Sequence, residues 1–220
     1  PFLSPFSMSA SEADLKIPEL SSVTFPVGGE GGLSGLSLLY GGLVICLLGI
    51  AFGLFQYFQT RKLDVHASMQ TVSNTIWETC KTYLLQQGKF LGVLWVLIAL
   101  CIGYYFLILR DFPAANVVLI LLASVLGNLG SYGVAWFGIR TNTVANSRGA
   151  FAALKGNPLH TLSIPLQSGM SVGLLLVSVE LFFMICILVF LPTHLVGACF
   201  LGFAIGESLG ASALRICGGI

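Results

Sequence analysis

The sequence predicts an all-α membrane protein, in which several transmembrane helices pack as a polytopic bundle. Of its 220 residues, 56% are hydrophobic and only 9% are charged, whereas soluble domains carry about 25% charged residues. The mean hydropathy is +0.93. Five apolar segments each reach the roughly 18 residues that indicate a membrane span. Together these observations argue against a soluble globular domain.

Residues 1–35 are rich in Ser, Pro and Gly and contain several carboxylates but a single basic residue, Lys16. This composition predicts an irregular polar leader, which ends in the glycine-rich stretch 28–32. The chain begins at Pro1, and no signal peptide is visible. We therefore expect a start that is processed or truncated.

Residues 36–220 are predicted to form the transmembrane helical region. The expected helices cover 36–58, 71–109, 114–147, 162–191 and 194–220. The second begins well before its apolar core, because residues 71–84 contain neither Pro nor Gly. The last carries Arg215 and has no polar tail after it, so we expect the chain to be cut inside a helix of a longer protein.

Basic residues in the short loops predict the orientation, because Lys and Arg are enriched in cytoplasmic loops. Loops 59–84 and 140–161 hold most of them, and the opposite side offers only Lys16 and Arg110. The two loops contain Arg61, Lys62 and Lys81, and Arg140, Arg148 and Lys155, respectively. Both loops are therefore expected in the cytoplasm, the leader outside, and Arg215 near the cytoplasmic side.

Small residues predict close helix packing in the fifth span. Gly202, Gly206 and Gly210 recur every four residues and form one stripe. Small side chains let helix backbones approach closely in lipid, where the hydrophobic effect does not drive association. We interpret the stripe as a packing surface of a tight bundle.

Three ionisable residues lie within the last two spans, where charge is costly and usually functional. At 1.5 Å per residue, Glu180 and Glu207 lie about 17 and 20 Å from the outer face, and Arg215 about 32 Å. The carboxyl groups are thus expected at similar depth, near the middle of the membrane. A direct salt bridge between Glu180 and Arg215 would have to span about 15 Å and is not expected.

The candidate coupling and ion-pathway residues are Arg215, Ser208, Ser212, Glu207 and Glu180. Ser208 and Ser212 precede Arg215 by seven and three residues, spacings that predict one helical face. Two structural alternatives stay open. Arg215 could extend its side chain to the cytoplasmic interface, and the two glutamates could be protonated or hydrogen-bonded groups without a transport role.

No catalytic or metal-binding motif is visible within the chain. The six cysteines include no Cys-x-x-Cys, and the three histidines are dispersed, so neither a disulfide framework nor a metal site is predicted. There is no P-loop, Gly-x-Ser-x-Gly or His-Glu-x-x-His. No basic and aromatic surface indicates nucleic acid as a partner.

Three segments nevertheless resemble the N-terminal third of the membrane-embedded, ion-pumping inorganic pyrophosphatases. Residues 76–84 (Ile-Trp-Glu-Thr-Cys-Lys-Thr-Tyr-Leu) resemble the start of the second helix of that family, and residues 145–156 resemble its cytoplasmic segment after helix three. Residues 215–220 (Arg-Ile-Cys-Gly-Gly-Ile) are similar to its Arg-Val-Gly-Gly-Gly-Ile. Cys217 replaces a glycine of that motif. Departures at Glu180, Glu207, Gln167 and Cys217 indicate a divergent subgroup.

The resemblance implies a pump of about sixteen membrane-spanning helices, which forms a homodimer in the lipid bilayer, with a bacterial inner membrane as the expected location. Such pumps hydrolyse magnesium-chelated inorganic pyrophosphate at a cytoplasmic site and move H⁺ or Na⁺. Mg²⁺ is the implied cofactor, and K⁺ is a further candidate.

By the same resemblance, Arg215 lies just below the hydrolytic pocket, whose ligands follow Ile220, so the 220 residues alone are expected to be inactive. The competing hypotheses are a secondary ion transporter or channel fragment without hydrolysis, and a non-catalytic membrane scaffold.

Overall fold

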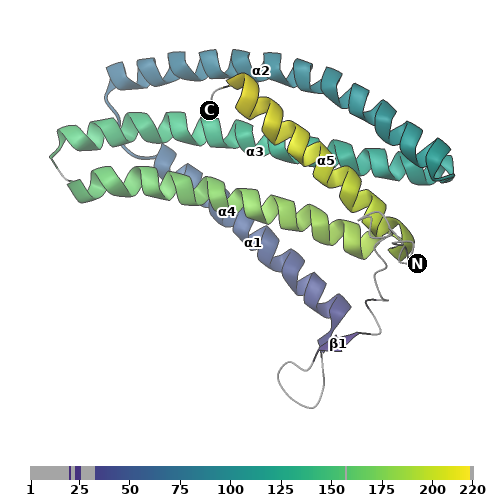
Figure 1. Cartoon of the computed structure of the whole chain (residues 1–220). Helices are drawn as coiled ribbons and strands as arrows, with labels where there is room; N and C mark the ends of the chain where they lie inside the picture. The colour runs from purple at the N-terminus through teal and green to yellow at the C-terminus, as the bar shows by residue number, and fades with distance from the viewer. Residues whose placement is uncertain (1–19, 21–22, 26–32, 157, 219–220) are drawn as a thin grey trace, which may run out of the picture.

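A computed structural model describes residues 20, 23–25, 33–156 and 158–218. Within these residues, five helices are long and apolar enough to cross a membrane, which confirms the predicted all-α polytopic architecture. They are α1 (Gly35–Arg61), α2 (Ala67–Tyr104, continued by the π-helical turn η2, Tyr105–Leu109), α3 (Ala114–Leu154), α4 (Pro158–Phe190) and α5 (Thr193–Gly218). Figure 1 shows α2, α3 and α4 running alongside one another, while α5 crosses α3 and α1 leans away from α4.

Two helices extend farther on the side of the basic loops than the apolar runs indicate. α2 begins at Ala67, where the side chain of the N-cap residue His66 accepts a hydrogen bond from the Ser68 amide. α3 continues to Leu154 and stops at Gly156, whose φ of 73° favours glycine. Pro158 then opens α4 at a position where its missing amide is tolerated. Polar residues without helix breakers therefore stay helical beyond the apolar segments.

A short β-hairpin precedes α1. Strands β1 (Thr24–Phe25) and β2 (Leu33–Ser34) pair antiparallel, and the Gly35 amide donates to the Val23 carbonyl at 2.9 Å. The predicted leader is thus ordered at this point into a hairpin rather than irregular. Most of residues 1–35, including the glycine-rich stretch, lies outside the described residues.

At several glycine positions, the backbones of α3 and α5 come into direct contact. A Cβ added to Gly206 would overlap the Ser124 carbonyl, and one added to Gly202 would lie 2.6 Å from the Ile120 carbonyl oxygen. From the opposite side, a Cβ on Gly127 would overlap the Phe203 carbonyl. The two backbones therefore touch, as small residues allow in membrane helices.

Polar side chains connect the other helix pairs. The Ser171 hydroxyl on α4 donates to the Gly53 carbonyl on α1 at 2.8 Å. The Tyr132 hydroxyl on α3 donates to the Leu84 carbonyl on α2 at 2.9 Å, and the Trp95 indole on α2 donates to the Ser124 hydroxyl at 3.2 Å. Such bonds between apolar helices contribute modestly but define which faces meet.

Both predicted basic loops gather at one end of the bundle. An Arg148 Nη donates to the Arg61 carbonyl at 3.1 Å, and Lys155 lies 3.9 Å from the Asp64 carboxylate. The end of α1, the start of α2 and the turn between α3 and α4 therefore lie together (Figure 1). The turn between α2 and α3 and the turn between α4 and α5 lie at the opposite end.

The close α3–α5 contact yields a first prediction. Gly206→Ala should destabilise the protein by about 1–3 kcal/mol, because the new methyl group meets the Ser124 backbone and cannot be relieved by a side-chain rotation. Helix propensity alone would make the alanine variant more stable by about 1 kcal/mol. At a helix position with open space around the glycine, the same substitution should therefore stabilise the protein, whereas at Gly206 it should destabilise it. The midpoint of thermal unfolding in detergent measures the effect.

The matched control is Gly133→Ala on α3, since a Cβ there meets nothing within 4 Å. This variant should be neutral or slightly more stable. Equal midpoints for the two variants would contradict the packing role of Gly206.

Candidate functional site

A cavity of about 420 Å³ lies between α3, α4 and α5 and contains three of the predicted site residues. Glu180 comes from α4, and Glu207 and Arg215 come from α5. The α3 wall contributes two uncharged polar side chains, Ser131 and Asn142. The remaining lining residues are Val134, Ala135, Gly138, Ile139, Val172, Leu176, Ala211 and Leu214. The cavity is thus an apolar space with a few convergent polar groups.

The two carboxyl groups meet across the α4–α5 boundary. The side chain of Glu180 lies within hydrogen-bonding reach of that of Glu207, and both residues are half-buried. The backbone of Glu207 is held from α3, because the Ser131 hydroxyl donates to its carbonyl at 3.0 Å. An ionised carboxylate has only acceptors, so a hydrogen bond between two carboxyl groups needs a proton on at least one of them.

Arg215 lies at the other end of the same cavity. It follows Glu207 by eight residues, a rise of about 12 Å along the helix, and its side chain is exposed. In the described part of the chain, ion pairs join Lys81 to Glu78 and Lys155 to Asp64. Neither of these ion pairs involves Arg215.

The structure does not bring Ser208 and Ser212 into this cavity. Both are exposed and line a separate hollow between α5 and α2, beside Ile98. Successive residues of a helix are about 100° apart, so Ser208 points away from the face that carries Glu207. The polar face predicted for the fifth span is therefore divided between two surfaces.

Gly202, Gly206 and Gly210 lie on the α3 side of α5. A Cβ on Gly210 would be 2.9 Å from the Ser131 Cβ, and Ser131 is the residue that bonds Glu207. The glycine contact thus holds the segment that carries Glu207 directly against α3.

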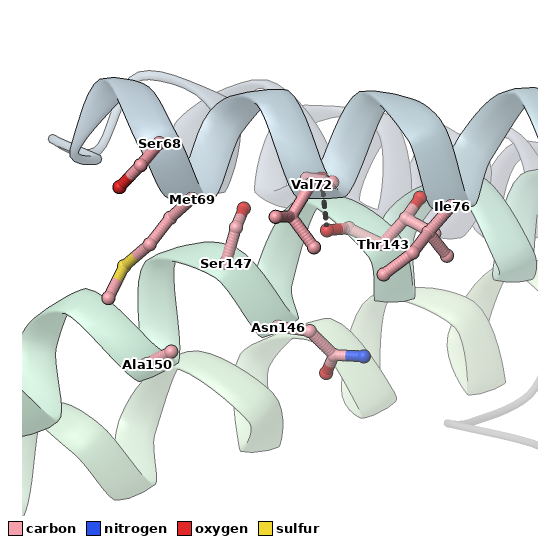
Figure 2. Close-up of a pocket in the computed structure, with 9 residues that line it drawn as sticks. Ser68, Met69, Val72, Ile76, Thr143, Asn146, Ser147 and Ala150 are labelled. Atoms are coloured by element: carbon pink, nitrogen blue, oxygen red, sulfur yellow. Dashed lines mark hydrogen bonds between the residues drawn. The ribbon is translucent and has the colours of Figure 1, made fainter.

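A second pocket lies between the first turns of α2 and the last turns of α3 (Figure 2). Its volume is about 330 Å³. Figure 2 shows Met69, Val72 and Ile76 facing α3, and the dashed line marks the Ser73 hydroxyl donating to the Thr143 carbonyl at 2.9 Å. The other lining residues are Ser68, Asn146, Ser147 and Ala150. Among the described residues that line this pocket, the polar groups are hydroxyls and one amide, and none is charged.

Sequence reasoning treated Arg148 only as a loop cation, but the structure buries it. Its side chain is 6% exposed and donates to the Val144 carbonyl, the Ser147 hydroxyl and the Arg61 carbonyl, each at 3.1 Å. The guanidinium therefore ties α3 to the end of α1. The sequence did mark this position, because Arg148 belongs to the segment 145–156 that resembles the pyrophosphatase family. Its burial, however, depends on how the helices pack.

No group of three or more His, Cys, Asp or Glu residues within the described ranges could hold a metal ion. The candidate site offers two carboxyl groups, which can bind a proton, and a guanidinium, which can bind anionic groups.

Comparison with known proteins identifies the family. A family model described as inorganic H⁺ pyrophosphatase matches residues 47–220. The chain belongs to this family. It is 59% identical over 179 residues to a K(+)-insensitive pyrophosphate-energized proton pump of Chlorobaculum tepidum, a match that covers 81% of the chain and 24% of the relative. A Pyrobaculum aerophilum protein of the same name is 29% identical over 185 residues, covering 81% of the chain and 25% of the relative.

The chain spans about a quarter of the length of these curated relatives. No solved structure matches it. The family membership confirms the resemblance found in the three sequence segments. Both relatives are named K(+)-insensitive, which does not fit K⁺ as a cofactor, so that expectation is not carried further.

Arg148 supplies a second prediction. Arg148→Met should lower the free energy of unfolding by about 2–4 kcal/mol, because a buried charge-assisted network is lost and the Arg61 carbonyl loses its donor. The change should also speed proteolytic cleavage between α1 and α2, at residues 62–66. Lys62→Met, an exposed neighbour, is the control for stability and should leave the free energy of unfolding unchanged. An Arg148→Met protein as stable as the control would show that the tie to α1 is dispensable.

Proposed function

We propose that this chain is the N-terminal part of a pyrophosphate-energised proton pump, which couples hydrolysis of inorganic pyrophosphate to proton transport across a membrane. The observation that carries the proposal is the family match over residues 47–220. The proton, rather than sodium, is favoured by the name of the 59% identical relative and by a mid-membrane pair of carboxyl groups.

In this proposal Arg215 is the coupling residue between hydrolysis and transport. Its guanidinium is permanently charged and can hold carboxylates or phosphate oxygens through two parallel hydrogen bonds. Glu180 and Glu207 lie along the same cavity and would form the ion pathway. Ser208 and Ser212, on the neighbouring face of α5, would provide polar contacts to the rest of the pump.

The hydrolytic site is proposed to come from the part of the relatives that this chain does not span. The substrate would be pyrophosphate chelated by Mg²⁺, and activity would not require K⁺. The pump is proposed to be a homodimer in a bacterial inner membrane. The basic ends of α1, α3 and α4 would face the cytoplasm, as the positive-inside rule favours, and the N-terminus would lie outside.

The direct test uses the full-length protein in sealed vesicles, with the hydrolytic side facing outward. Addition of magnesium pyrophosphate should acidify the vesicle interior, with the same rate in potassium-free buffer and without uptake of sodium. Phosphate release without acidification, or sodium uptake in its place, would refute the proposed activity.

A variant at Arg215 tests the coupling role. Arg215→Lys keeps the charge but loses the planar fork, so proton transport should fall by about tenfold, consistent with the roughly 1.5–3 kcal/mol of a charge-assisted hydrogen bond. Phosphate release and acidification are measured in the same vesicles. The control is Arg110→Lys, at the opposite end of the bundle, which should pump normally. Normal transport by Arg215→Lys would remove Arg215 from the coupling route.

A further inference from the structure

The position of Glu180 on α4 and Glu207 on α5 limits how many protons the two carboxyl groups can lose. Glu180 and Glu207 lie about 15 and 21 Å from the Phe190 end of α4 and the Thr193 end of α5, near the middle of a hydrocarbon core about 30 Å thick. Two ionised carboxylates in contact repel each other, and the low dielectric of the membrane interior strengthens that repulsion. A carboxyl pair in such a place therefore holds at least one proton.

The residues around the two carboxyl groups determine how much negative charge the cavity can hold. Among the described residues that line the cavity, the one other ionisable group is Arg215. The α3 wall presents Ser131 and Asn142, and the α4 wall adds apolar Val172 and Leu176. One negative charge on the pair would face one positive charge about 12 Å away along α5, whereas two negative charges would leave the cavity with a net charge.

The contacts also prevent the pair from separating easily. Glu207 is held by the Ser131 hydroxyl on its carbonyl and by the neighbouring Gly206, which touches the Ser124 backbone. Two residues before Glu180, Ser178 on α4 lies against Gly49 of α1. Both carboxyl groups are thus carried by packed segments, which suits a site that binds and releases a proton without a large rearrangement.

We propose that Glu180 and Glu207 together form one proton-binding site, which always keeps one proton in the hydrogen bond between the carboxyl groups and exchanges a second. The loaded site is two neutral carboxylic acids. Unloading breaks one O–H bond, sends that proton into the cavity and leaves a carboxylic acid bonded to a carboxylate. This inference rests on the proposed function only for the statement that the exchanged proton is the transported one.

If one proton always stays between the two carboxyl groups, replacing either glutamate by glutamine should have a specific effect. A glutamine donates a hydrogen bond through its NH₂ group, so it can replace the carboxyl group that stays protonated. Glu180→Gln and Glu207→Gln should each keep most of the proton transport, because one exchangeable carboxyl group remains beside a donor. The double variant Glu180→Gln/Glu207→Gln has no exchangeable proton and should lose transport.

Infrared spectroscopy of the purified full-length protein tests proton binding without reference to pumping. The difference between the wild type and the double variant, followed across pH, should contain a carboxylic-acid C=O band that persists at high pH and a second that titrates. Each single variant should show the titrating band alone. The matched control, Asp111→Asn at the outer end of the bundle, should leave the band pair of the wild type intact.

The outcomes separate the inference from the proposed function. A wild type that does not acidify vesicles refutes the pump, while the infrared bands still decide whether the pair binds protons as described. Absence of a protonated carboxyl band from the difference spectrum overturns the retained proton. Normal transport by the double variant, or loss of transport in both single variants, overturns the shared site.

Discussion

The close contact between α3 and α5 is the constraint on which the candidate site depends. Gly206 and Gly127 let the two backbones meet at Ser124 and Phe203, and this contact sets the rotation of α5. With α5 in this rotation, Glu207 faces α4, where it meets Glu180. Arg215 falls two turns later along the same cavity. A larger side chain in the glycine stripe would change the separation of the helices and, with it, the distance between the carboxyl groups.

The charges near the membrane interior follow a consistent physical pattern. Arg148, which is buried at the end with the basic loops, donates to two backbone carbonyls and to the Ser147 hydroxyl. The two carboxyl groups near the middle of the bundle instead lie within hydrogen-bonding reach of each other. Arg215 is exposed and belongs to no ion pair among the described residues. The first arrangement stabilises helix packing, whereas the second and third leave groups whose charge or partners can change, as transport requires.

Much of the architecture could be predicted from the sequence because membrane spans are a strong signal. Long apolar runs identified five helices, and residue counting placed Glu180 and Glu207 at similar depth, where the structure has them in contact. The polar start of the second helix was expected from residue 71, but the residues from Ala67 in α2 and those up to Leu154 in α3 lie beyond the expected bounds, because they fall outside the long apolar runs. The separation of Ser208 and Ser212 from Arg215 was also missed, since spacing along one helix does not reveal which neighbouring helix each face meets. The pocket beside Met69 and Thr143 likewise depends on packing between α2 and α3.

Coupling between hydrolysis and proton movement is the central claim, and it can be tested most directly through back-pressure. In sealed vesicles of the full-length protein, a coupled pump is slowed by the proton gradient that it builds. Addition of a protonophore should therefore accelerate release of phosphate from magnesium pyrophosphate, and a sodium ionophore should not. A rate of phosphate release that is unchanged by the protonophore, in vesicles shown to be sealed, would contradict coupling to protons.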